Sequence, residues 1–160
     1  MVSRRVFPIF LFATFSLFLF ALLPLALTRA QNSTDPWAPL QTVQPADLAK
    51  ELENGNPATT VLFVGFRRLY IGGHIKGAQF HGSGGSADGV AEIKSWATPL
   101  PRSTKLVIYC GCCPMAKCPN IRPAYIALHE MGFTNLRVLI LPTSFAADWA
   151  EKGLPYDKGQ

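Results

Sequence analysis

The sequence predicts an α/β domain with a mostly parallel central sheet flanked by helices. Three short apolar runs, residues 61–64, 106–109 and 136–141, are bounded by turn residues and lack a regular polar alternation. An unbroken apolar run is typical of a parallel strand that is covered on both faces. Segments with helical spacing lie between these runs, and strands that alternate with helices favour a parallel sheet.

Four segments of the domain carry helix signals. Pro45 suits a first helical turn, and apolar residues at helical spacing follow it as far as Asn54-Gly55. Gly132 and Gly153 each follow a periodic segment, at the position where glycine commonly ends a helix. We therefore expect helices over residues 45–52, 88–96, 121–131 and 145–152.

The first thirty residues have the pattern of an export signal. Arg4 and Arg5 precede an almost uncharged run over residues 6–27, and small residues stand before a possible cleavage point after Ala30. The run is also long enough to span a bilayer, so residues 1–30 are expected to be a signal peptide or an N-terminal membrane anchor. The protein is expected to be exported, periplasmic or extracellular, with a membrane tether through residues 6–27 only if that segment is retained.

The rest of the chain divides into a linker over residues 31–42 and one domain over residues 43–157. Three of the fifteen Lys and Arg residues fall in residues 1–30, so the remainder has a formal charge of 12 − 10 = +2. Nucleic-acid binding needs a clustered basic face, and this nearly neutral domain argues against it.

The most informative residues are the four cysteines, which all fall within nine positions: Cys110, Cys112, Cys113 and Cys118. They follow the apolar run 106–109, and ligands of parallel sheets bind beyond the carboxyl ends of strands. Three interpretations stay open. The cysteines could be relay or redox thiols, ligands of a metal ion or iron–sulfur cluster, or partners in local disulfides.

Three segments along the domain carry a further pattern: Gly73-His74-Ile75-Lys76-Gly77-Ala78 with Tyr70 just before it, the run from Leu106 to Cys110, and Trp149 followed by Gly153-Leu154-Pro155. Together they resemble the signature, the catalytic strand and the carboxyl-terminal ending of rhodanese-like domains. The resemblance covers most of residues 43–156 and implies a rhodanese-like fold.

The resemblance also implies a function, that of a sulfurtransferase. Cys110 would be the nucleophile, with a low thiol pKa, and would carry sulfane sulfur as a persulfide from a small donor such as thiosulfate to a thiol acceptor. From their place in or just after the loop, Lys117 and Arg122 are expected to bind the anionic donor or to stabilise the thiolate by charge, and Cys112, Cys113 and Cys118 are expected to be auxiliary thiols. No cofactor is expected for this function, and His74 is expected to hold backbone rather than to move protons.

This chain departs from the family pattern at three points. Phe63-Val64-Gly65 stands where the family has an Asp-x-Arg pair, Pro142-Thr143-Ser144 stands where paired glycines are usual, and the loop after Cys110 is enlarged. The extra cysteines lie in the enlarged loop. The alternative function is therefore a non-catalytic module whose cysteines bind a metal or an iron–sulfur cluster, or act as a thiol redox relay.

Overall fold

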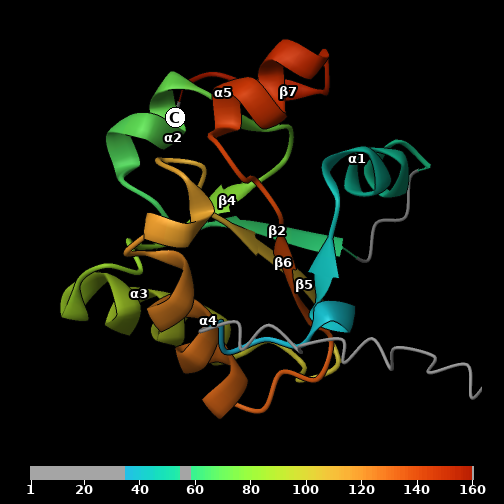
Figure 1. The fold of residues 1–160 in the computed structure, drawn as a ribbon. Coiled ribbons are helices and arrows are strands. Elements are labelled where there is room, and N and C mark those ends of the chain that lie inside the picture. Colours follow the sequence, from blue (N-terminus) through green and yellow to red (C-terminus); the bar gives the residue numbers. More distant parts are fainter. Residues whose placement is uncertain (1–34, 55–58, 160) are drawn as a thin grey trace, which may run out of the picture. The chain divides into compact units, whose positions relative to one another are not determined.

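The computed structural model describes residues 35–54 and 59–159, which form a twisted sheet between two layers of helices (Figure 1). The predicted export segment and the start of the predicted linker lie outside these residues. In the part of the chain that the structure describes, no helix is long and apolar enough to cross a membrane.

The main sheet has five parallel strands in the order β1-β6-β5-β2-β4. Their bounds are Thr42–Val43 for β1, Thr59–Phe63 for β2, Gln79–Phe80 for β4, Lys105–Tyr109 for β5 and Leu136–Leu139 for β6. A second, antiparallel pair joins β3 (His74–Ile75) to β7 (Tyr156–Asp157). The fold class predicted from the sequence is confirmed, and β5 is its central strand.

The two faces of the sheet pack against different helices. On one face lie α3 (Ala87–Ala97) and α4 (Ile121–Glu130). On the other lie α1 (Pro45–Glu53), α2 (Arg67–Gly72) and α5 (Phe145–Asp148). Short 3-10 turns complete the domain: η1 (Pro39–Gln41), η2 (Met115–Lys117) and η3 (Ala150–Lys152).

Alternate residues of β5 enter different cores. Val107 and Tyr109 pack with the α1 and α5 layer, whereas Leu106 and Ile108 pack with the α3 and α4 layer. Successive side chains of a strand point to opposite faces, so the next residue, Cys110, continues toward α4 and belongs to that core. The apolar run predicted from the sequence thus fixes the direction of the first cysteine.

The three predicted strands and four predicted helices are present, with shifts of one or two residues at several ends and one helix divided. The strand predicted over residues 136–141 ends at Leu139, and the helix predicted over residues 145–152 is divided into α5 and η3 at Trp149. Trp149 is fully buried, and its indole N–H donates to the carbonyl oxygen of Pro155 at 2.9 Å. This anchor interrupts the regular helix.

The chain already packs onto the domain before Val43, where the domain was predicted to begin. Trp37 is only 6% exposed and makes an edge contact with Tyr125, their ring centroids 5.4 Å apart. Asp35 forms an ion pair with Arg122 of α4. Part of the predicted linker is therefore core, since burying one tryptophan outweighs the polar character of its neighbours.

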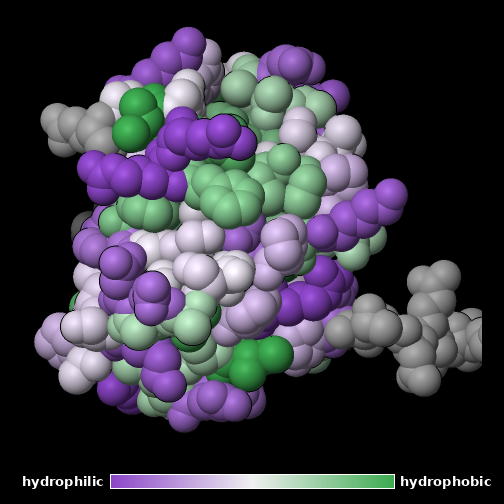
Figure 2. Space-filling model, turned by 90° about the vertical axis from the view of Figure 1, so that its left-hand side faces the viewer, coloured by the Kyte–Doolittle hydropathy of each residue, from purple (hydrophilic) through white to green (hydrophobic). Residues whose placement is uncertain are grey.

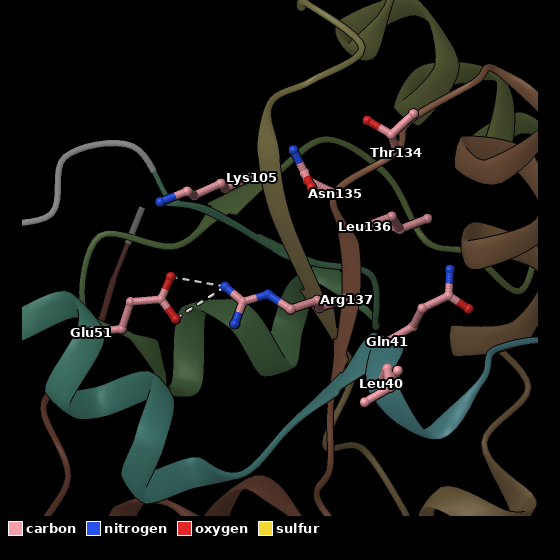
Figure 3. A pocket seen from close by; sticks show the side chains of 8 residues that line it. All are labelled: Leu40, Gln41, Glu51, Lys105, Thr134, Asn135, Leu136 and Arg137. Carbon is pink, nitrogen blue, oxygen red and sulfur yellow. Dashed lines mark hydrogen bonds and ion pairs between the residues drawn. The ribbon is translucent and has the colours of Figure 1, made fainter.

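An ion pair between Glu51 of α1 and Arg137 of β6 links the helix to the sheet, at the end of the strands opposite to the cysteines. Figure 3 views an open pocket of about 320 Å³ there, in which the Glu51 carboxylate faces the Arg137 guanidinium. Arg137 Nη2 lies 2.8 and 3.0 Å from the two carboxylate oxygens, and the Thr59 hydroxyl donates to Glu51 at 2.6 Å. The hydrogen bond from Arg137 holds the pKa of Glu51 below its ordinary value.

Glu51→Gln is expected to lower the free energy of unfolding at neutral pH by less than about 1 kcal/mol, the range for a partly exposed ion pair. Folding lowers the Glu51 pKa, so the pair stabilises fully above the ordinary pKa of 4.5 and loses its effect as the pH falls through the lowered value. Urea unfolding at neutral pH and near pH ~3 measures this, since most carboxylates are protonated at the lower pH. The exposed Glu53→Gln change in the same helix is the matched control. An equal loss at both pH values would contradict the expectation.

Candidate active site in the cysteine loop

The site begins where β5 ends. Val64 N donates to the carbonyl oxygen of Tyr109 at 2.8 Å, and the Tyr109 hydroxyl accepts the N–H of Ile75 at 2.9 Å. Burial raises the pKa of this phenol, so Tyr109 stays neutral and its hydroxyl remains a hydrogen-bonding group. The residue before Cys110 is thus fixed from two neighbouring segments.

Gly111 turns the chain sharply after Cys110. Its φ of +67° is in the left-handed region, and a Cβ atom there would stand 2.7 Å from Phe145 Cβ. The Gly111 carbonyl oxygen accepts the N–H of Phe145 at 2.9 Å, and Met115 N donates to the Pro142 carbonyl oxygen at 3.3 Å. The cysteine loop is therefore bound to the segment that leads into α5.

The turn brings the sulfur atoms together. Cys110 Sγ lies 3.0 Å from Cys112 Sγ, and Cys112 Sγ lies 3.2 Å from Cys113 Sγ. Cys118, from the far side of the loop, completes a group in which the sulfurs of Cys110, Cys112 and Cys118 all lie within 4.8 Å of one another. All four cysteines are free thiols in the structure.

Gly65 provides space beside this group. It occupies part of the region where the family has a charged pair, and a Cβ atom there would come within 3.1 Å of Cys110 Sγ and 2.5 Å of the Phe63 ring. Glycine at position 65, where the chain departs from the family pattern, thus leaves the space that the Phe63 ring and Cys110 Sγ occupy. The absence of a side chain at position 65 lets the strand edge approach the sulfur.

The sequence-based expectation of a low pKa at Cys110 was wrong. Its hydrogen bond to Cys118, together with burial, raises the pKa of Cys110 far above the ordinary thiol value. The same hydrogen bond lowers the pKa of Cys118 to about 5, assisted by the backbone N–H groups of Asn120 and Ile121 and opposed by burial. Burial also raises the pKa of Cys113 to about 12. The enlarged loop puts Cys118, rather than Cys110, beside the backbone donors that precede α4.

The open side of the site is a pocket of about 350 Å³. Cys110 and Cys112 line it, and the other lining residues include apolar Leu69, Phe145 and Tyr156 and the cations Arg68 and Lys158. Cys118 does not line this pocket. Figure 2, which views the side that carries α2, shows hydrophobic groups directly beside strongly hydrophilic ones in the upper half of the face. The pocket thus combines a buried and a half-buried cysteine, Cys110 and Cys112, with apolar walls and positive charge.

Lys117 and Arg122 lie elsewhere. Lys117 is exposed on η2, and Arg122 donates to the carbonyl oxygens of Met115 and Cys118, each at 3.3 Å, in addition to its ion pair with Asp35. Arg122 therefore holds the loop in shape. Arg68 and Lys158 are the cations of the pocket, and sequence patterns missed them because both are far from Cys110 along the chain.

His74 forms a hydrogen bond with the backbone, as we expected from its position in the Gly-His-Ile signature. Its Nδ1 lies 2.8 Å from the carbonyl oxygen of Tyr70, and its ring stacks on the Tyr70 ring at a centroid distance of 3.8 Å. The Tyr70 hydroxyl in turn donates to the Ala78 carbonyl oxygen at 2.6 Å. This histidine is buried and is not among the residues that line the cysteine pocket.

Gly111→Ala and Gly132→Ala form a matched pair that tests the close packing of the loop. Gly132 also has a left-handed φ, of +87°, but a Cβ atom there meets nothing within 4 Å. Gly132→Ala is expected to cost about 1–2 kcal/mol from its backbone alone. Gly111→Ala should cost about 1–3 kcal/mol more because of its overlap with Phe145. Urea unfolding of both variants measures the difference, and equal losses would count against the close contact.

Comparisons with known proteins agree with this architecture. No family model and no curated protein matches the chain. A rhodanese-like domain from Anabaena is 25% identical, with a TM-score of 0.55 and coverage of 74% of this chain and 79% of that one. A Bacillus halodurans protein is 19% identical, with a TM-score of 0.59 and coverage of 74% and 78%. A thiosulfate sulfurtransferase from Pseudomonas aeruginosa is 24% identical, with a TM-score of 0.50 and coverage of 74% of this chain but 19% of that one.

These likenesses, the parallel sheet and the cysteine at the end of its central strand agree on one architecture. The described part of the chain has the rhodanese-like fold, with a cysteine-rich loop after β5.

Proposed function

We propose that this domain is a sulfurtransferase that carries sulfane sulfur as a persulfide on Cys110. The observation that carries the proposal is the pocket in which Cys110 lies. Of the two cysteines with a low exposed fraction, Cys110 and Cys118, only Cys110 lines the pocket that also contains Arg68 and Lys158. An anionic donor entering this pocket would meet both positive charge and a nucleophilic sulfur.

The reaction proceeds in two displacements. The Cys110 proton moves to the Cys118 thiolate along the hydrogen bond between the two sulfurs, and the resulting Cys110 thiolate attacks the outer sulfur of a donor such as thiosulfate. The donor's S–S bond breaks, and sulfite leaves with the bonding electron pair. An acceptor thiolate then attacks the outer sulfur of the Cys110 persulfide, takes it as a new persulfide and restores the Cys110 thiolate. Cys112, whose sulfur is 3.0 Å from that of Cys110 and which lines the same pocket, is an auxiliary thiol within reach of such a transfer.

The fold supports this chemistry. The Pseudomonas aeruginosa neighbour is a thiosulfate sulfurtransferase, and thiosulfate is a small dianion that suits a pocket with two cations. The apolar side chains of the pocket lower the local dielectric constant beside the sulfur, which strengthens the attraction between the donor and the cations.

A second candidate function is soft-metal binding, which the mutual distances of three sulfurs favour. Cys110, Cys112 and Cys118 all have their sulfurs within 4.8 Å of one another, and Cys113 lies beside Cys112 as a potential fourth ligand. Thiolate ligands select Cu(I), zinc and iron–sulfur clusters. A bound metal would engage the sulfur of Cys110, so one molecule cannot hold the metal and carry sulfane sulfur on Cys110 at the same time.

Cys110→Ser is expected to lower the rate of sulfur transfer from thiosulfate to a thiol by at least about a thousandfold, because serine cannot form a persulfide. Reduced wild-type protein incubated with thiosulfate should gain the mass of one sulfur atom. Fragment-ion sequencing should locate that sulfur on Cys110.

Two results would contradict this assignment. One is a persulfide that survives in Cys110→Ser and disappears in Cys118→Ser, which would make Cys118 the carrier. The other is anaerobically purified protein with a stoichiometric metal and no gain of sulfur, which would favour the metal-binding function.

We also propose that residues 1–30 direct the protein out of the cytoplasm, and that the chain is cleaved after Ala30. N-terminal sequencing of the native protein is expected to begin at Gln31. An intact N-terminus in the membrane fraction would instead support a retained anchor. A cytoplasmic protein that begins at Met1 would contradict export altogether.

A further inference from the structure

Asn120 is a fully buried polar residue beside the cysteines. It immediately precedes α4 and has 0% exposure. Its side-chain nitrogen Nδ2 lies 3.4 Å from Cys110 Sγ and 3.6 Å from Cys112 Sγ. Its two N–H groups therefore face two sulfur atoms, one of which is the proposed carrier.

Ser83 determines which end of the amide faces the sulfurs. The Ser83 hydroxyl donates to Asn120 Oδ1 at 2.9 Å, across a sequence separation of 37 residues. With the oxygen occupied by this donor, the amide nitrogen points toward Cys110 and Cys112. Asparagine carries both a donor and an acceptor end, so a fixed partner at the oxygen also fixes the donor.

Two glycines hold this arrangement from the other side. A Cβ atom at Gly84 would stand 2.0 Å from the Asn120 backbone oxygen, and one at Gly85 would stand 2.5 Å from Oδ1. Gly84 N donates to the Val64 carbonyl oxygen at 2.9 Å, which ties the glycine segment to the end of β2. The segment can lie directly against Asn120 only because it has no side chains there.

A buried amide N–H with only neutral thiols as acceptors is weakly satisfied, because thiol sulfur is a poor acceptor. A negatively charged sulfur accepts the same hydrogen bonds much more strongly. The amide therefore gains most when charge develops on Cys110 Sγ, as it does when an acceptor takes the outer sulfur of the persulfide and Cys110 leaves as a thiolate. Fixed donors that strengthen in this way stabilise a transition state more than the ground state.

We propose that Asn120, oriented by Ser83, is a catalytic hydrogen-bond donor to the anionic sulfur of Cys110. This inference rests on the proposed sulfurtransferase function and deepens it. Asn120 touches the reacting sulfur and is the catalytic residue, whereas Ser83 acts through Asn120 and is a positioning residue. No bond to Asn120 forms or breaks, and its amide only supplies hydrogen bonds.

The test is the single-turnover rate constant for sulfur transfer from the Cys110 persulfide to an acceptor thiol, the step in which Cys110 leaves as a thiolate. This rate constant does not depend on the fraction of folded protein. Asn120→Asp keeps the size of the side chain but replaces the donor with a carboxylate. We expect the rate constant to fall by about a hundredfold or more, as for loss of one fixed donor to a developing anion. Asn135→Asp is the matched control: it makes the same substitution at an exposed amide that bonds to Ser103, beyond the opposite end of the strands.

Ser83 provides a second, milder test if Asn120→Asp does not fold. Ser83→Ala removes the orienting hydroxyl and should reduce the rate constant about tenfold, the effect of about 1.4 kcal/mol. Ser83→Thr restores the hydroxyl and should recover most of the rate. Ser86→Ala removes a different hydroxyl nearby, the N-cap of α3, and should lower stability without changing the rate constant.

The outcomes separate this inference from the function on which it rests. Wild-type protein that gains sulfur on Cys110, with unchanged rate constants in the folded Asn120→Asp and Ser83→Ala variants, would overturn the role of Asn120 and leave the sulfurtransferase function intact. Wild-type protein that gains no sulfur would overturn both. A loss in Ser83→Ala that Ser83→Thr fails to restore would reduce Ser83 to a packing residue and would contradict the proposed orientation of the amide.

Discussion

The meeting of β5 with the residue that precedes α4 is the constraint on which the rest of the site depends. β5 delivers Cys110 to the face that carries α4, and Asn120 stands at the start of that helix with its amide toward the sulfur. A shift of one residue in the strand would turn every side chain to the other face. The hydrogen bonds at Tyr109 from Val64 N and Ile75 N therefore do more than stabilise a strand end, because they fix the register that the sulfur needs.

Most of the fold could be predicted from the sequence because its central elements have strong patterns. β2, β5 and β6 are apolar and covered on both faces, and the helices between them end at recognisable turns. The strands β1, β3, β4 and β7 have two residues each, too few to display any periodicity. The helix α2 was also missed, because only Tyr70 among its six residues is buried and no apolar face repeats.

The candidate site was only partly predictable. Cys110 could be found because it follows a strand directly, and Cys112 because the turn at Gly111 is local. Tertiary structure brings Arg68 from α2 and Lys158 from the segment after β7 to the pocket that Cys110 lines, and it brings Asn120, at the start of α4, to the sulfur of Cys110. Spacing along the sequence carries no signal for such contacts. The role of Gly84 and Gly85 likewise depends on Asn120, which packs against them from 35 or more positions away along the chain, a contact that no local pattern predicts.

That packing has a consequence for how the sequence can vary. A side chain at Gly85 would occupy the volume now filled by the Asn120 side-chain oxygen, and a smaller residue at position 120 that made room would remove the amide from the sulfurs. A side chain at Gly84 would instead meet the Asn120 backbone oxygen, which no substitution at position 120 moves away. Among natural variants of this chain, position 84 is therefore expected to stay glycine, and a side chain at position 85 is expected only where residue 120 is smaller than asparagine.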